Sequence, residues 1–198
     1  MTDLTGKTAV ITGSTSGIGL GLARGFAQAG ANVVLNGFGD AAEIERTRAD
    51  LDASAAGQVS YDSADMTKPD QIEALINTAS AHGLVASPFK SAYVTAKHGV
   101  VGMSKTIALE VAEDGITCNA ICPGYVLTPL VEKQIPDTAK SRGMTEKEVK
   151  RNVLLAAQWT KKVATVEQLA GVAVSLCSEV AENITGVALP VDGRGTAV

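Results

Sequence analysis

A glycine-rich turn between an apolar run and a helix-forming stretch constrains the fold of this chain most. Residues 8–12 (Thr-Ala-Val-Ile-Thr) predict a buried strand of a parallel sheet. Gly13, Gly17 and Gly19 follow, and residues 17–29 carry apolar side chains at helical spacing. Glycines there let the backbone approach a pyrophosphate closely, and the helix N-terminus offers it free N–H groups. The turn alone is weak evidence, but its strand and helix context favours a dinucleotide site.

The rest of the chain continues to alternate strand-like and helix-like segments. Further strands are predicted at 32–35, 58–61, 116–121 and 185–191, and further helices at 41–56, 70–79, 91–113 and 166–178. This rhythm suits right-handed crossover units. The sequence therefore predicts an α/β, Rossmann-like, doubly wound parallel sheet in a single domain, 1–198, with a polar helical lid at about 128–162.

Composition narrows the function classes. The net charge is −4 and the pI about 5.2, which argues against nucleic-acid binding, since phosphate backbones need concentrated Lys and Arg. The three cysteines form no Cys-x-x-Cys pair, so buried free thiols are expected rather than disulfides or a metal site. No secretory signal and no apolar run of about 20 residues is visible, so a cytoplasmic protein without membrane contact is predicted.

Tyr93 and Lys97 indicate the chemistry. They stand four residues apart in a helix-forming stretch, so their side chains project from the same helix face. An ammonium group beside a phenol is one way to promote proton transfer near neutral pH. Ser80 precedes them by a short loop. Together with the glycine-rich turn, these residues indicate a nicotinamide-dependent oxidoreductase.

The residues around the turn favour NAD over NADP. Besides glycine, the turn holds only Ser, Thr and Ile, and residues 36–40 (Asn-Gly-Phe-Gly-Asp) contain no Arg or Lys for an adenosine 2′-phosphate. The usual acidic residue for the ribose is not evident, although Asp40 is near. Asp65 is a candidate adenine contact, and a capping or turn aspartate is an equally good interpretation of it.

Three motifs together resemble the short-chain dehydrogenase/reductase superfamily. They are Thr-Gly-x-x-x-Gly-x-Gly at 12–19, Tyr-x-x-x-Lys at 93–97 and Pro-Gly at 123–124. The resemblance implies Tyr93 as general acid/base, Lys97 as its partner and ribose contact, and Ser80 as donor to the reacting oxygen. It also implies a set of cofactor contacts: Gly13, Thr15, Ser16, Gly17, Ile18, Gly19, Phe38, Asp65, Tyr93, Lys97, Pro123, Gly124, Val126 and Thr128.

The resemblance further implies a short hydroxy acid as substrate and a homotetramer. His82, Lys90 and Gln134 would bind the substrate carboxylate, since a carboxylate needs charged or strongly polar donors. A loop histidine, a surface lysine and a surface glutamine are the plainer interpretations of these three. Tyr125 would line the substrate pocket, and Trp159 is expected to pack under the lid.

One part of the family pattern cannot be found. Family members carry two central strands, an Asn-Asn-Ala-Gly loop and a helix with a catalytic asparagine before the serine. A truncated sheet is therefore expected, with a segment missing between Ala79 and Ser80 and with Val100 and Ile107 uncovered. The chain is then either an active dehydrogenase or a catalytically impaired NAD-binding remnant. Another short hydroxy acid, or an alcohol, is the alternative substrate.

Overall fold

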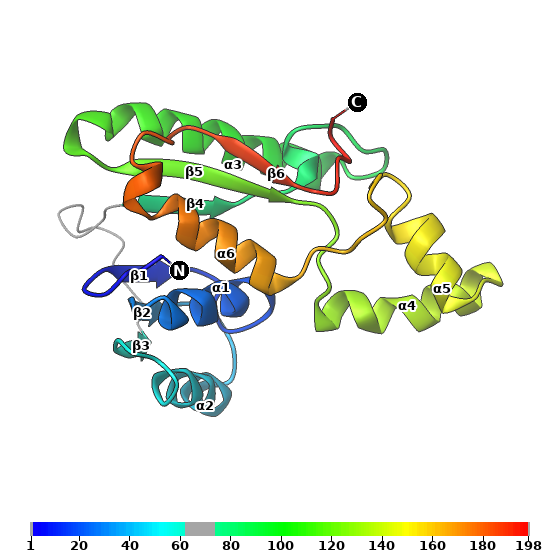
Figure 1. Ribbon diagram of the computed structural model, residues 1–198. Coiled ribbons are helices and arrows are strands. Elements are labelled where there is room, and N and C mark those ends of the chain that lie inside the picture. Colours follow the sequence, from blue (N-terminus) through cyan, green and yellow to red (C-terminus); the bar gives the residue numbers. More distant parts are fainter. Residues whose placement is uncertain (1, 62–73, 198) are drawn as a thin grey trace. The chain divides into compact units, whose positions relative to one another are not determined.

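The computed structural model describes residues 2–61 and 74–197, which form two compact units. The first comprises Met1–Ala74 and Val166–Asn183, and the second comprises Leu75–Thr165 and Ile184–Val198. Each unit has a three-stranded sheet with helices packed on it (Figure 1). The predicted Rossmann-like α/β class is confirmed. Asp65 lies outside the described residues.

The first unit is built on three parallel strands. They are β1 (Thr8–Ile11), β2 (Asn32–Leu35) and β3 (Val59–Tyr61), with β2 in the middle. Thr8 of β1 pairs with Asn32, and Val33 of β2 pairs with Val59. The central strand buries Val33 and Leu35 completely. β2 is thus an interior strand, as predicted, whereas β1 and β3 lie at the edges of this sheet, and Val10 of β1 is 46% exposed rather than buried as predicted for residues 8–12.

Helix α1 (Gly17–Gln28) packs closely on α6 (Val166–Leu176), a segment distant in sequence (Figure 1). Two glycines of α1 make this approach possible. A Cβ atom added at Gly21 would lie 2.5 Å from the Val166 Cβ, and one at Gly25 would lie 2.5 Å from the Ala170 Cβ. Since real Cβ atoms do not approach so closely, any larger residue at these positions would push the helices apart.

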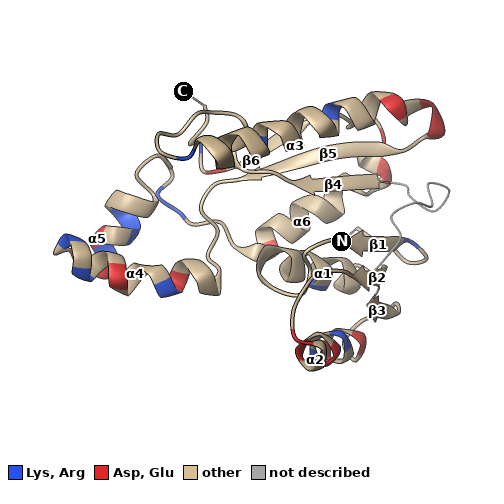
Figure 2. Cartoon of the chain, turned by 180° about the vertical axis from the view of Figure 1, so that it is seen from behind, with Lys and Arg blue, Asp and Glu red and all other residues tan. Residues whose placement is uncertain are grey.

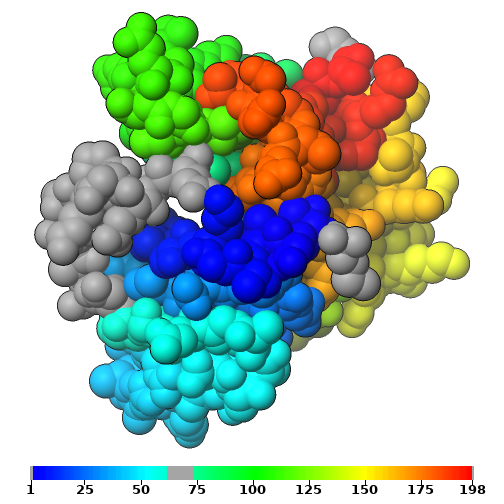
Figure 3. Space-filling view, turned by 60° about the vertical axis from the view of Figure 1, so that its left-hand side comes forward, coloured from blue at the N-terminus to red at the C-terminus, as the bar shows by residue number. Residues whose placement is uncertain are grey.

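Helix α2 (Ala41–Asp52) covers β3, and the two lie together on the face shown in Figure 3. Asp40 caps this helix, since its carboxylate accepts hydrogen bonds from the backbone N–H groups of Ala42 and Glu43 at 3.0 and 3.1 Å. The helix buries only Ile44 and Leu51. It ends four residues before the predicted boundary at 56.

The second unit has β5 (Thr117–Pro123) between β4 (Ala74–Thr78) and β6 (Ala188–Val191), with β5 and β6 parallel. Helix α3 (Ser91–Glu110) packs along β5 (Figure 1). Short 3₁₀ turns stand at Ala81–Gly83 and Ala112–Asp114, with another at Glu179–Ala181 in the first unit. A small core joins strands and helix: Ala79, Val101, Ala120 and Cys122.

Strand β4 corrects two predictions. A helix was predicted over 70–79, yet Ala74–Thr78 is extended, and the Ala79 N–H donates to the Ile121 carbonyl at 2.8 Å. Of the two strands expected to be missing, the one that leads to Ser80 is therefore present. The Ala79–Ser80 junction therefore follows a strand rather than a helix. The segment pairs with β5 instead, and its Ile76 and Thr78 are β-branched residues that favour strands.

The exposure of α3 also differs in detail from the prediction. Val100 packs against the small core, and Ile107 is half-buried. The exposed apolar side chains are instead Met103, 48% exposed, and Leu109, 83% exposed. The helix therefore does leave apolar surface uncovered, but on a face rotated from the one expected.

The polar segment after β5 forms α4 (Pro129–Arg142), α5 (Glu146–Glu148) and a π-helical turn, Val149–Leu154. Ile135, Ala139 and Val149 make a separate small core for it. Charged side chains cluster on α4 and α5, as they do on α2 (Figure 2). Trp159 is 71% exposed, so the prediction that it packs under this segment is wrong. Its neighbour Gln158 takes the buried position instead.

Candidate functional site

The glycine-rich turn of the first unit has the form of an anion cradle. Gly13 and Gly17 adopt positive φ angles of 65° and 56°, which side chains resist. Ser14 is fully buried and fastens the turn to the end of β2. Its N–H donates to the Asn36 carbonyl at 2.8 Å, and its Oγ accepts from the Asn36 N–H at 2.9 Å. The turn is therefore held open by bonds to the neighbouring strand.

The cradle fits a pyrophosphate. A Cβ atom at Gly19 would collide with the Gly13 carbonyl oxygen, so only glycine allows this close approach of backbone. Ser16 occupies the N-cap position of α1, but its side chain does not cap the helix. The first N–H groups of α1 thus keep their capacity to bind an anion, which the positive end of the helix dipole favours.

A cleft of about 540 Å³ lies beside the turn, between the end of β2 and α2. Phe38 is fully exposed at its rim, and the Thr15 hydroxyl donates to the Phe38 carbonyl at 3.0 Å. The cleft brings together predicted and unpredicted residues: Thr15, Ser16, Phe38, Gly39, Asp40, Glu43, Ile44, Arg46, Thr47 and Asp50. Its charged lining is three carboxylates and one guanidinium.

In the second unit, the predicted catalytic side chains lie around the start of α3. The ring of His82 meets that of Tyr93 edge-on, with centroids 6.0 Å apart and planes at 84°. The Lys97 ammonium lies 5.8 Å from the centre of the same Tyr93 ring. Ser80 caps the 3₁₀ turn that carries His82, and its Oγ accepts from the His82 N–H at 3.2 Å. Tyr93 is 46% exposed and thus accessible to a ligand.

Lys97 and Ser80 are both anchored to the sheet. The Lys97 Nζ donates to the Thr78 carbonyl, at the end of β4, at 3.2 Å. The backbone of Ser80 hydrogen-bonds the sulfur of Cys122 in β5, while burial raises the pKa of that thiol. The bond to the Thr78 carbonyl can hold Lys97 in place before any ligand is bound. The bond to Cys122 fixes the loop that carries Ser80.

The surroundings of His82 disfavour its protonated form by lowering its pKa. Burial lowers the pKa of its imidazole, and the nearby positive charge of Lys90 lowers it further. Lys90 itself is exposed and stands just before α3, after Phe89, which has a positive φ of 62°. Lys90 thus lies close enough to His82 to affect its pKa electrostatically.

This pKa shift predicts a pH effect on stability. Because the folded pKa of His82 lies below its unfolded value, the unfolded chain takes up the proton first. The contribution of His82 to the free energy of unfolding should therefore be fully present above about pH 6.5 and be lost as the pH falls through the folded pKa of His82. We expect His82→Gln to weaken the acid-induced fall in thermal midpoint between pH 7.5 and 5. His98→Gln, at an exposed position, is the control and should leave that fall unchanged.

The segment after β5 carries the other predicted contacts. Pro123 and Val126 are buried, Gly124 and Tyr125 are half-buried, and Thr128 caps α4 by accepting from the Val131 N–H at 3.4 Å. Gln134 lies further along α4, is exposed, and is not brought together with His82 by any contact of the described residues. Thr128 and Tyr125 therefore sit on one short stretch, while Gln134 sits apart on the helix.

Sequence reasoning missed Cys122 and Gln158, both of which hold these loops in place. Cys122 directly precedes the Pro-Gly motif at 123–124, and Gln158 stands next to no motif identified in the sequence. What marks Gln158 as important is the burial of its amide side chain, and burial of a single polar residue cannot be read from a sequence pattern. Among the described residues, no group of three His, Cys, Asp or Glu side chains is arranged to hold a metal ion.

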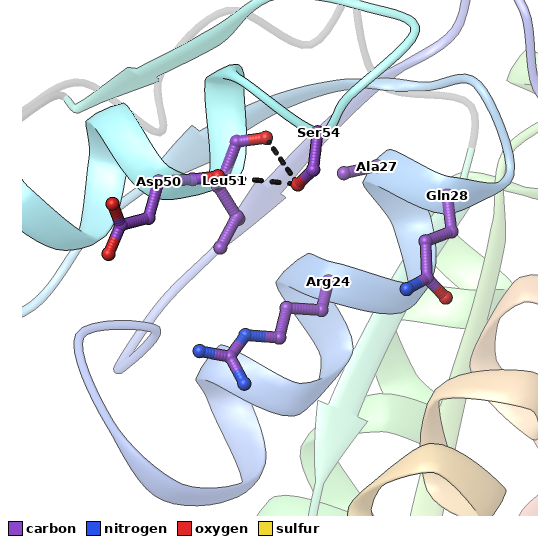
Figure 4. A pocket seen from close by; sticks show the side chains of 6 residues that line it. All are labelled: Arg24, Ala27, Gln28, Asp50, Leu51 and Ser54. Carbon is purple, nitrogen blue, oxygen red and sulfur yellow. Dashed lines mark hydrogen bonds between the residues drawn. The ribbon is translucent and has the colours of Figure 1, made fainter.

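A second hollow, of about 210 Å³, lies between α1 and α2 (Figure 4). Arg24 and Asp50 face it with opposite charges, and the Ser54 hydroxyl is already bonded to the Leu51 and Asp50 carbonyls at 3.0 and 3.3 Å. Its lining has no nucleophile with a neighbouring base. None of the predicted site residues lines it.

Fold and site together define a dinucleotide-binding oxidoreductase of the Rossmann type. Residues 7–81 match the family described as short chain dehydrogenase, and residues 73–195 match the family described as Enoyl-(Acyl carrier protein) reductase. The chain belongs to the short-chain dehydrogenase/reductase family. The two matches meet at 73–81, the stretch that holds β4 and Ser80.

Two relatives match over almost their whole length. The chain is 46% identical to D-beta-hydroxybutyrate dehydrogenase of Rhizobium meliloti (strain 1021), covering 96% of this chain and 99% of the relative. It is 37% identical to D-beta-hydroxybutyrate dehydrogenase of Cupriavidus necator, covering 98% and 99%. The first alignment spans 255 positions, more than the 198 residues present here, so that relative has residues with no counterpart in this chain.

Solved structures agree with this assignment. L-sorbose reductase from Gluconobacter frateurii, complexed with NADPH and L-sorbose, superposes with a TM-score of 0.85 and 27% identity, covering 96% of this chain and 97% of that one. A second structure of the same complex gives a TM-score of 0.88. In the described part of the chain, no helix is both long and apolar enough to cross a membrane.

Proposed function

We propose that this chain is an NAD-dependent dehydrogenase that interconverts D-3-hydroxybutyrate and acetoacetate. The observation that carries the proposal is the grouping of Tyr93 with His82 and Lys97 beside the Ser80 turn. The near full-length relatives named D-beta-hydroxybutyrate dehydrogenase support the substrate. A tyrosine needs such neighbours to exchange a proton with an alcohol near neutral pH.

In the proposed reaction, Tyr93 takes the hydroxyl proton of the alcohol as the C–O bond becomes a carbonyl. Ser80 donates a hydrogen bond to the same oxygen and stabilises its developing negative charge. Lys97 favours the proton transfer electrostatically, and the Thr78 carbonyl keeps its ammonium in place. His82, Lys90 and Gln134 bind the carboxylate, and Tyr125 lines the pocket. The nicotinamide, when bound, supplies the hydride chemistry.

The cradle at Gly13, Gly17 and Gly19 would hold the pyrophosphate, with Thr15, Ser16 and Ile18 around it, and Phe38 would contact the adenosine. Pro123, Gly124, Val126 and Thr128 would hold the nicotinamide end. The charge of the cleft supports NAD over NADP, since Asp40, Glu43 and Asp50 outnumber Arg46 there. A 2′-phosphate would face net negative charge at short range.

The first prediction of this proposal is a direct assay. Purified protein should form NADH from D-3-hydroxybutyrate, with kcat/KM at least about tenfold higher for NAD than for NADP, a difference of about 1.4 kcal/mol. The measurement is absorbance at the reduced nicotinamide band with each cofactor in turn. Equal or better use of NADP would reject the cofactor assignment, and preference for a neutral alcohol would reject the hydroxy acid.

A catalytically impaired, NAD-binding protein is the second candidate. The sequence has no Asn-Asn-Ala-Gly, and the alignment with the Rhizobium relative leaves residues without a counterpart here. Those residues would include the asparagine that the family resemblance implies in the reaction. This candidate predicts NADH binding, visible by fluorescence, without turnover.

A cytoplasmic location and a homotetramer complete the proposal. Gel filtration with light scattering tests the oligomeric state.

A further inference from the structure

Gln158 is a buried polar side chain whose amide oxygen and amide nitrogen both have hydrogen-bond partners. It is 3% exposed and lies in the second unit, just after the π-helical turn. Its Oε1 accepts from the Tyr125 N–H at 2.7 Å, and its Nε2 donates to the Lys162 carbonyl at 2.8 Å. One carboxamide thus joins the segment after β5 to the loop that leads out of the helical lid segment.

Backbone hydrogen bonds also join these two segments next to Gln158. Val126 bridges Ala164, the Ala164 N–H donates to the Tyr125 carbonyl at 3.1 Å, and the Leu127 N–H donates to the Ala164 carbonyl at 3.0 Å. A Cβ atom at Gly124 would lie 2.6 Å from the Gln158 Oε1, so the amide packs directly against the backbone at this glycine. The side-chain hydrogen bonds of Gln158 therefore extend the short ladder of backbone hydrogen bonds between the two segments.

We propose that Gln158 is a positioning residue that fixes the Gly124–Thr128 segment and so sets the affinity for the nicotinamide end of the cofactor. This inference rests on the proposed function, in which that segment holds the nicotinamide and Tyr125 lines the pocket. An amide is required because the position needs one acceptor and one donor. Leucine would leave the Tyr125 N–H and the Lys162 carbonyl unpaired, and a glutamate would lose the donor and bury a charge.

The test compares NADH with ADP-ribose, which lacks the nicotinamide, as ligands of the unaltered protein, Gln158→Leu and Gln158→Glu. We expect both variants to bind NADH about tenfold more weakly and ADP-ribose with unchanged affinity. Gln28→Leu, at an exposed position of α1, is the matched control and should bind both ligands as the unaltered protein does. Isothermal titration calorimetry measures the affinities.

Hydrogen exchange without ligand gives an independent readout. Exchange of the Tyr125 amide should speed up in Gln158→Leu, while amides of β5 stay protected. Equal loss of NADH and ADP-ribose affinity, or no loss of either, would overturn the inference even if the enzyme is active. Failure of the unaltered protein to bind NADH would overturn the proposed function instead, and the inference with it.

Discussion

Replacing Tyr93 with phenylalanine should lower the rate of alcohol oxidation by about 10²–10⁴-fold, a much larger effect than any loss of NADH affinity from the missing hydroxyl contact. The variant keeps the ring that meets His82 edge-on and lies under the Lys97 ammonium, so the local packing is preserved. It removes only the oxygen that exchanges the proton with the alcohol. Single-turnover oxidation of D-3-hydroxybutyrate, monitored as NADH absorbance, measures the chemical step directly.

Tyr61→Phe is the matched control for this variant. The Tyr61 hydroxyl donates to the Gly37 carbonyl at 2.9 Å in the first unit, so the same change removes a hydrogen bond but no proposed catalytic group. It should retain the rate of the unaltered chain. If Tyr93→Phe oxidised the substrate as fast as Tyr61→Phe, another group would have to carry the proton, and the proposed mechanism would fail.

Gly19→Ala should weaken NADH binding by about 100-fold, or about 3 kcal/mol. The new Cβ atom would meet backbone, the Gly13 carbonyl oxygen and the Ser14 Cα, rather than a flexible side chain that could move away. The turn must therefore open, which displaces the N–H groups of α1 that the proposal assigns to the pyrophosphate. Fluorescence titration with NADH measures the loss.

Gly171→Ala separates this effect from general instability. Gly171 lies in α6 of the same unit, and a Cβ atom added there meets nothing within 4 Å. That variant should bind NADH normally and raise the free energy of unfolding by about 0.5–1 kcal/mol, because alanine favours the helix more than glycine does. Normal NADH affinity of Gly19→Ala would show that the turn is not the phosphate site.

Local features of the sequence predicted most of the fold and the proximity of Tyr93 to Lys97. The boundaries of β2 were predicted without error and those of α1 within one residue, because strand alternation, helix periodicity and a terminating glycine all lie within a few neighbours. Tyr93 and Lys97 lie near each other for the same reason, since a helical turn fixes their separation.

Contacts between distant segments decided the rest. A helix is predicted over residues 74–78, yet they form a strand because β5 offers hydrogen-bond partners about 40 residues further along. The exposure of Trp159 and the burial of Gln158 likewise depend on which of two adjacent side chains meets the Tyr125 backbone. Neighbouring residues determine the backbone preference and the spacing of side chains along a helix. The hydrogen-bond partner of a buried polar group, in contrast, comes from a distant segment and is supplied only by the folded chain.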